Sequence, residues 1–187
     1  MATDQKVRGS IPLGRAIILT AKTEKLVYMI SYHEKWMEQA FLEAEKAYQK
    51  KEVPIGAVIV FEEKVIGRGH NLVETLQDPT AHAEMLAITA AANYLGTWRL
   101  NNTCLYVTLE PCPMCAGAIL NSRIPNLVFG AYDKKFGACG SVTDAFAGNG
   151  LHHSITQQAG VLQPKCEAIL KDFFKKIRLN SSDVSLN

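Results

Sequence analysis

The sequence lacks both a strong charge of one sign and any long hydrophobic run. Its 187 residues include 20 basic and 18 acidic side chains, a formal net charge of +2 at pH 7, which by itself indicates no polyanionic partner. The most apolar runs, near residues 53–60 and 116–120, are far shorter than the roughly 18 residues that span a bilayer. We therefore expect a soluble protein without a membrane segment, in which any nucleic-acid site is a local patch.

Cysteine is scarce, and an export signal is missing. The 5 cysteines are an odd number in a chain long enough to fold without disulfides, which favours a reducing compartment and a cytoplasmic location. Pro12, Gly14 and Arg15 interrupt the short apolar piece near the start, so no signal peptide is predicted. With 48% hydrophobic and 20% charged residues, the composition suits one globular domain with a real core.

Strands alternate with helices along the chain. Apolar residues recur at three- and four-residue spacing over residues 33–51, which predicts an amphipathic helix. Further helices are predicted after residue 82, at about 111–123 and at 164–179, and strands at 53–61, 64–69, 104–109, 126–131 and 155–159. This order predicts an α/β fold, a three-layer α/β/α sandwich around a central mixed sheet.

The domain organisation follows from where the periodic pattern begins and ends. Residues 1–31 show no strong period and are expected to form a poorly specified extension, within which Met29 offers an alternative start. The domain is predicted over residues 32–180, followed by a short tail at 181–187. Residues 71–80, which end in Asp-Pro-Thr, are predicted to form a loop.

Two short motifs carry the chemistry, each at a predicted helix start. The first is His82-Ala83-Glu84, and the second places Cys112 and Cys115 three residues apart. Alone, a Cys-x-x-Cys pair is often a redox pair or a chance spacing, and a His-x-Glu pair is often surface decoration. Together they supply a soft-metal ligand set, because free backbone N–H groups at a helix start favour the thiolate form.

His82, Cys112 and Cys115 give three protein ligands, which leaves one position of a tetrahedral metal open. A structural zinc site is normally closed by four residues, so three ligands favour a catalytic site. Glu84 stands close to the ligands without being one, where a general acid and base is needed. The remaining cysteines, Cys104, Cys139 and Cys166, are isolated and are expected to be small buried side chains.

These motifs resemble the zinc-dependent nucleoside and nucleotide deaminases, whose signature is His-x-Glu followed by Pro-Cys-x-x-Cys. The similarity is closest to the bacterial tRNA-specific adenosine deaminases and covers about residues 33–179. The segments that carry it are Glu52–Val58, His70–Asn71, Ala81–Met85, Leu105–Cys112, Met114–Ala118, Val128–Ala131, Asp133 and Phe173–Phe174.

The resemblance implies a homodimeric, cytidine-deaminase-like enzyme that converts adenosine to inosine at the wobble position of a tRNA anticodon. It implies one zinc ion per subunit, held by His82, Cys112 and Cys115, and a zinc-activated hydroxide that attacks the flipped-out base. Glu84 would act as the proton shuttle.

The same resemblance implies substrate contacts. Asn71 and the backbone near Ala83 would receive the base, Asp133 matches the family pattern, and Phe173, Phe174 and Arg178 would lie near the anticodon loop. From the residues alone, Asn71 reads as a turn residue, the basic C-terminal helix as a solvated face, and the Phe pair as partly core. His152 stands where the family usually has asparagine, so the contact expected there is in question.

Two other functions remain open from the sequence. One keeps the chemistry but acts on a free base or nucleoside, such as guanine, cytosine or cytidine. The other is a non-catalytic, zinc-stabilised partner subunit that binds tRNA. Such a subunit need not keep the acid that Glu84 supplies, so it ranks last.

Overall fold

The computed structural model describes residues 21–147 and 154–184. In chain order the elements are α1 (Ala21–Gln49), β1 (Gly56–Phe61), β2 (Lys64–His70), α2 (Val73–Leu76), α3 (Ala83–Leu95), β3 (Cys104–Leu109), α4 (Pro113–Asn121), β4 (Asn126–Ala131), β5 (Thr156–Gln158) and α5 (Gln163–Val184). Within the described residues, no helix is long and apolar enough to cross a membrane.

One sheet of five strands, in the order β2-β1-β3-β4-β5, forms the centre of the fold. Strand β1 is antiparallel to both β2 and β3, whereas β3, β4 and β5 run parallel to one another. The hairpin between β1 and β2 turns through Glu62 and Glu63, which have φ of 46° and 57°. Two left-handed residues match the twist of a tight hairpin, although neither side chain is a favoured turn former.

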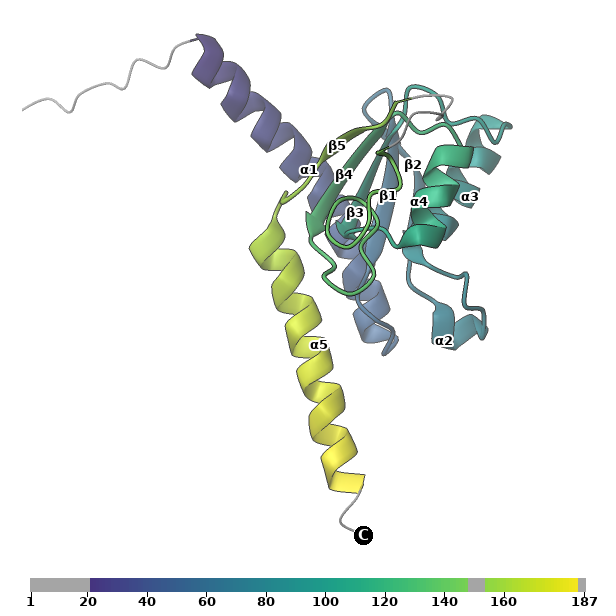
Figure 1. Ribbon diagram of the computed structural model, residues 1–187, viewed down its shortest axis with the longest axis vertical. Coiled ribbons are helices and arrows are strands. Elements are labelled where there is room, and N and C mark those ends of the chain that lie inside the picture. The colour runs from purple at the N-terminus through teal and green to yellow at the C-terminus, as the bar shows by residue number, and fades with distance from the viewer. Residues whose placement is uncertain (1–20, 148–153, 185–187) are drawn as a thin grey trace, which may run out of the picture.

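Helices cover both faces of the sheet, so the predicted α/β/α sandwich is confirmed (Figure 1). Side chains alternate along the strands: Ala57 and Ile59 pack toward α3 and α4, while Val58 and Val60 pack toward α1 and α5. This two-residue period is expected of a strand buried on both faces. The parallel strands β3 and β4 follow the same rule, which divides the core into two layers.

Three segments differ from the sequence prediction. Helix α1 begins at Ala21, well before residue 33, and α5 continues to Val184. Residues 21–32 contain neither Pro nor Gly, so the backbone can continue the helix without an apolar stripe. The expected loop at 71–80 contains the short helix α2, which is too brief to produce a periodic pattern.

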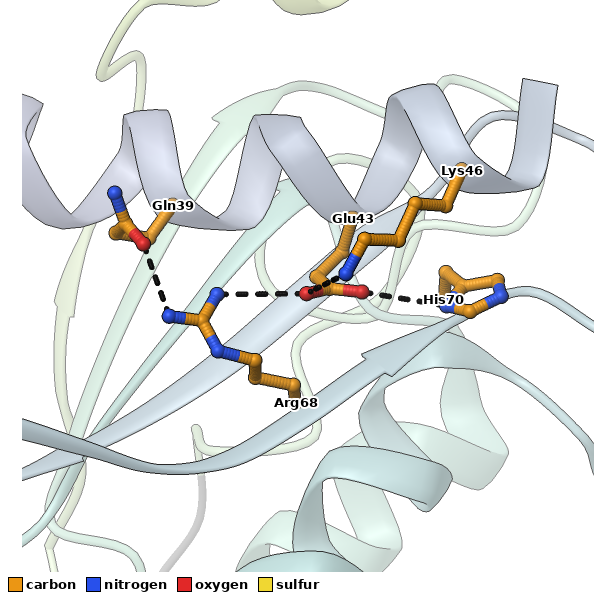
Figure 2. A network of polar contacts seen from close by, with 5 residues as sticks. All are labelled: Gln39, Glu43, Lys46, Arg68 and His70. Carbon is orange, nitrogen blue, oxygen red and sulfur yellow. Dashed lines mark hydrogen bonds and ion pairs between the residues drawn. The ribbon is translucent and has the colours of Figure 1, made fainter. Parts of the chain in front are cut away.

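A polar network joins α1 to the edge strand β2 (Figure 2). The buried carboxylate of Glu43 accepts bonds from Lys46 and Arg68 and pairs with Nδ1 of His70 at 3.3 Å. Gln39 accepts a second bond from Arg68. These contacts hold the end of β2 against α1, immediately before Asn71.

Candidate metal centre

The proposed metal ligands lie at the starts of two helices. His82 is the N-cap of α3 and Cys112 the N-cap of α4, and neither side chain caps its own helix. Both side chains are therefore free to face a common point. Cys115 follows in the first turn of α4. Helices α3 and α4 lie side by side on one face of the sheet (Figure 1).

Close backbone packing sets the position of α3. Gly69 of β2 faces the start of this helix, and a Cβ atom there would lie 2.2 Å from the carbonyl oxygen of Ala83. Only glycine permits an approach this close. The absence of a side chain at Gly69 therefore brings His82 and Glu84 down onto the sheet.

The donor atoms of the three residues fit a tetrahedral zinc ion. The ligand atoms of His82, Cys112 and Cys115 all lie within 4.8 Å of one another. His82 Nδ1 is 3.7 Å from Cys112 Sγ and 3.5 Å from Cys115 Sγ. Zinc bound at ordinary Zn–N and Zn–S lengths places tetrahedral N and S ligands about 3.6 Å apart. The two measured N–S distances therefore match those expected of a tetrahedral zinc site.

The two thiols differ in acidity. A hydrogen bond from Cys115, helped by His82, lowers the pKa of Cys112 to about 4 against the effect of burial. The same bond, together with burial, raises the pKa of Cys115. A soft cation binds both groups as thiolates, so its binding would release the proton that Cys115 holds more tightly than Cys112.

Glu84 is buried beside this group on the first turn of α3. Burial raises the pKa of its carboxyl above the usual value, and the neighbouring His82 opposes the rise. It lies close enough to Cys115 for each group to shift the pKa of the other. A carboxyl with a raised pKa can hold and release a proton near neutral pH, which suits a general acid and base.

A second buried carboxylate supports the Cys112 side of the centre. Glu110, only 2% exposed, accepts backbone N–H bonds from Asp133, Cys139 and Ser141, each at 3.0 Å. The Ser141 hydroxyl also donates to it. Glu110 thus ties residues 133–141 to the end of β3, two residues before the first thiol.

Asn71 and Ala83, the two residues expected to receive the base, are both buried. Asn71 follows β2, and its backbone N–H donates to Ile55 at 3.0 Å. Its side-chain Nδ2 donates to Glu52 Oε2 at 3.1 Å. Ala83 is the first residue of α3. Asn71 is thus anchored by its side chain and is more than a turn residue.

The residues expected to contact RNA are dispersed. Asp133 accepts the N–H groups of Lys135 and Phe136 and so stabilises its own turn. On α5, Phe173 is 6% exposed and packs against Tyr48, whereas Phe174 is 43% exposed. Arg178 is exposed farther along the same helix. His152 lies outside the described residues.

Two residues with clear roles in the structure, Glu52 and Glu110, received no role from the sequence. Each is an acid beside an apolar strand segment, and both are almost fully buried. That position was the available signal, because an acid next to a buried strand must find hydrogen-bond donors. The donors that satisfy these two acids come from the short helix α2 and from loops, whose sequences show no hydrophobic period.

The mixed sheet, the open His-Cys-Cys group and the buried acid define a deaminase of cytidine-deaminase-like architecture. The chain matches the MafB19-like deaminase family over residues 31–178. It is 49% identical over 145 residues to the tRNA-specific adenosine deaminase of Bacillus subtilis strain 168, an alignment that covers 78% of this chain and 90% of that protein.

Solved structures agree. A structure from work on A-to-I editing by tRNA:A34 deaminases at the wobble position has a TM-score of 0.70 and 44% identity, covering 73% of this chain and 99% of the other. Guanine deaminase from Bacillus subtilis has a TM-score of 0.51 and 40% identity, covering 54% and 64%. The chain belongs to the tRNA-specific adenosine deaminase family, as its motifs predicted.

Proposed function

We propose that this protein hydrolyses adenosine to inosine at the wobble position of a tRNA anticodon. The observation that carries the proposal is the convergence of His82, Cys112 and Cys115 beside the buried carboxyl of Glu84. The family to which the chain belongs supports the choice of tRNA as substrate. We propose residues 32–180 as the catalytic domain.

His82, Cys112 and Cys115 would hold one zinc ion. Zinc would supply Lewis acidity that makes water a nucleophile at neutral pH. Glu84 accepts the proton that the attacking water releases and delivers it to a ring nitrogen of adenine. It then takes the remaining proton from the added hydroxyl and passes it to the amino group, which leaves as ammonia when the C–N bond breaks and the oxygen becomes the carbonyl of inosine. Its burial keeps these transfers away from bulk solvent.

Asn71 would hold the base, because its amide lies at the end of β2 beside the loop that leads to His82.

For the RNA loop, Phe174 is the better placed of the Phe pair, since a stacking surface must be exposed. We expect Phe174→Ala to raise KM for an anticodon stem-loop about tenfold. Phe173→Ala should instead destabilise the fold by about 3 kcal/mol. Stem-loop kinetics and urea unfolding of both variants test this difference.

We propose a homodimer. The segment that Glu110 ties to the metal centre, residues 133–141, carries the exposed apolar side chain Phe136. Tyr132 and Val142, which flank the segment, are also exposed. A second copy packed here would bury them.

The five free cysteines suit a reducing, cytoplasmic setting, where the thiols remain available for metal.

The deciding experiment measures inosine formation on an anticodon stem-loop that carries adenosine at the wobble position. The wild type should form inosine, whereas Glu84→Ala should form none and still retain about one equivalent of zinc. Loss of metal or fold in Glu84→Ala would contradict the proton-shuttle role. If the wild type deaminated free guanine and left the stem-loop unchanged, the substrate would be a small molecule. Binding of the stem-loop without turnover of any substrate would indicate a partner subunit.

A further inference from the structure

Among the side chains that the structure describes, Glu52 is the most completely buried charged one outside the metal centre, with 1% of its surface exposed. It lies just before β1 and accepts bonds from three groups on the far side of the hairpin. Its Oε2 accepts Asn71 Nδ2 at 3.1 Å and the Glu74 N–H at 3.3 Å, and its Oε1 accepts the Thr75 N–H at 2.6 Å. No step of the proposed mechanism uses this carboxyl.

The protonation state of Glu52 fixes the direction of these bonds. Burial works to raise the pKa of this carboxyl, but the bonds from Thr75, Glu74 and Asn71 outweigh it and lower the pKa below the usual value. The group is therefore a carboxylate at neutral pH, and a carboxylate only accepts hydrogen bonds.

An acceptor-only partner allows the Asn71 amide a single orientation. With Nδ2 toward Glu52, one N–H is satisfied at 3.1 Å. If the amide were turned over, Oδ1 would face Oε2 and two acceptors would oppose each other. The orientation leaves Oδ1 and the second N–H of Asn71 to bond a ligand. That second N–H is the donor that a ring nitrogen of a purine requires.

We propose that Glu52 is a positioning residue for deamination: it locks the Asn71 side chain in the orientation that receives the base. The inference rests on the proposed function, in which Asn71 holds the base. Its geometric part, the locked amide, stands on the hydrogen bonds alone.

A purely structural role makes a different prediction. Glu52 also binds the backbone N–H groups of Glu74 and Thr75, so it anchors the first turn of α2. If this were its whole effect, a change at Glu52 would act on the loop regardless of the side chain at position 71. If Glu52 acts through Asn71, removing the Asn71 amide abolishes its effect on catalysis.

A double-mutant cycle separates the two roles. We expect Glu52→Gln to lower kcat/KM for the stem-loop about tenfold, because an amide at this position also tolerates the inverted orientation of Asn71. In the Asn71→Ala background, the same substitution should change kcat/KM by less than about twofold. Zinc content and thermal midpoint are measured for every variant, so that a loss of folded enzyme is not counted as a loss of positioning.

Glu43 supplies the matched control. It is also a buried carboxylate, and it bonds Lys46, Arg68 and His70 rather than Asn71 (Figure 2). The effects of Glu43→Gln and Asn71→Ala on kcat/KM should therefore multiply independently. Equal coupling of Glu43 and of Glu52 to Asn71 would show a general loosening of the fold and would overturn the proposal.

Nuclear magnetic resonance of the zinc-loaded protein gives a readout independent of activity. The signal of the Asn71 side-chain amide is assigned by its disappearance in Asn71→Ala. Its hydrogens should exchange slowly with solvent in the wild type and rapidly in Glu52→Gln. Rapid hydrogen exchange of this amide in the wild type would overturn the locked orientation. If the wild type made no inosine, the proposed function would fall, and with it the catalytic part of this inference. An active wild type without coupling between Glu52 and Asn71 would overturn this inference alone.

Discussion

Replacing Glu110 with glutamine should destabilise the protein strongly, although the two side chains have nearly the same size. The carboxylate is buried, and each of its oxygens accepts two bonds. Oε1 accepts the N–H groups of Cys139 and Ser141, and Oε2 accepts the Asp133 N–H and the Ser141 hydroxyl. An amide replaces one acceptor with a donor, so some of these bonds must fail.

The magnitude follows from the best arrangement open to the amide. With NH₂ in place of Oε1, two backbone N–H groups would face a donor. With NH₂ in place of Oε2, only the Asp133 N–H loses its acceptor, because the Ser141 hydroxyl can turn and accept. One stranded N–H costs about 1–3 kcal/mol, and the remaining bonds lose their charge assistance. We expect a total of about 3 kcal/mol, or a melting point lower by roughly 6–12 °C.

Urea unfolding of the zinc-loaded Glu110→Gln variant measures this cost. Ser141→Ala is the matched control, because it removes only the hydroxyl bond and should cost about 0.5–1.5 kcal/mol. In the double variant the amide has lost the hydroxyl as acceptor, so the combined cost should exceed the sum of the single costs. A Glu110→Gln variant within about 0.5 kcal/mol of the wild type would refute the reasoning.

Three further predictions concern the metal, the packing and the pH dependence. Cys112→Ser should lose zinc and stability together, because metal binding contributes to folding; metal analysis and melting with and without a chelator test this. Gly130→Ala should cost about 1–3 kcal/mol, because a Cβ there would lie 2.5 Å from Cys166 Sγ. Gly117→Ala, with no atom within 4 Å of the new Cβ, should be neutral or stabilising in urea unfolding. Burial lowers the pKa of His70 below its ordinary 6.5. The unfolded chain then binds more protons between the two pKa values, so stability should fall as pH drops below about 6.5. Unfolding at about pH 7.5 and about pH 5.5 should show a smaller difference in His70→Gln than in the wild type.

The candidate ligand group could be recognised from the sequence because each motif is local. His82 and Glu84 are two residues apart, and Cys112 and Cys115 are three apart. Both pairs lie at the starts of helices that proline and apolar spacing predict. Helix geometry then fixes the relative direction of each pair. The buried strand residues could be predicted equally well, because the alternation of Ala57 with its neighbours is a short-range pattern.

The two supporting carboxylates could not be predicted in the same way. The partners of Glu52 lie 19 to 23 positions away, and those of Glu110 lie 23 to 31 positions away. Most are backbone N–H groups of the short helix α2 or of loops, and such groups are present at every residue except proline. The sequence can show that a buried acid needs donors, but not which segment will supply them.

The meeting of the two motifs depends on a pairing that the sequence did not reveal. Strand β1 is antiparallel to β2 on one side and to β3 on the other. Strands β2 and β3 therefore run in the same direction, and their C-terminal ends lie at the same end of the sheet. The chain leaves β2 toward His82 and leaves β3 toward Cys112. A predicted hairpin fixes only the first pairing. If β3 had paired parallel to β1, the two motifs would lie at opposite ends of the strands and could not share a metal.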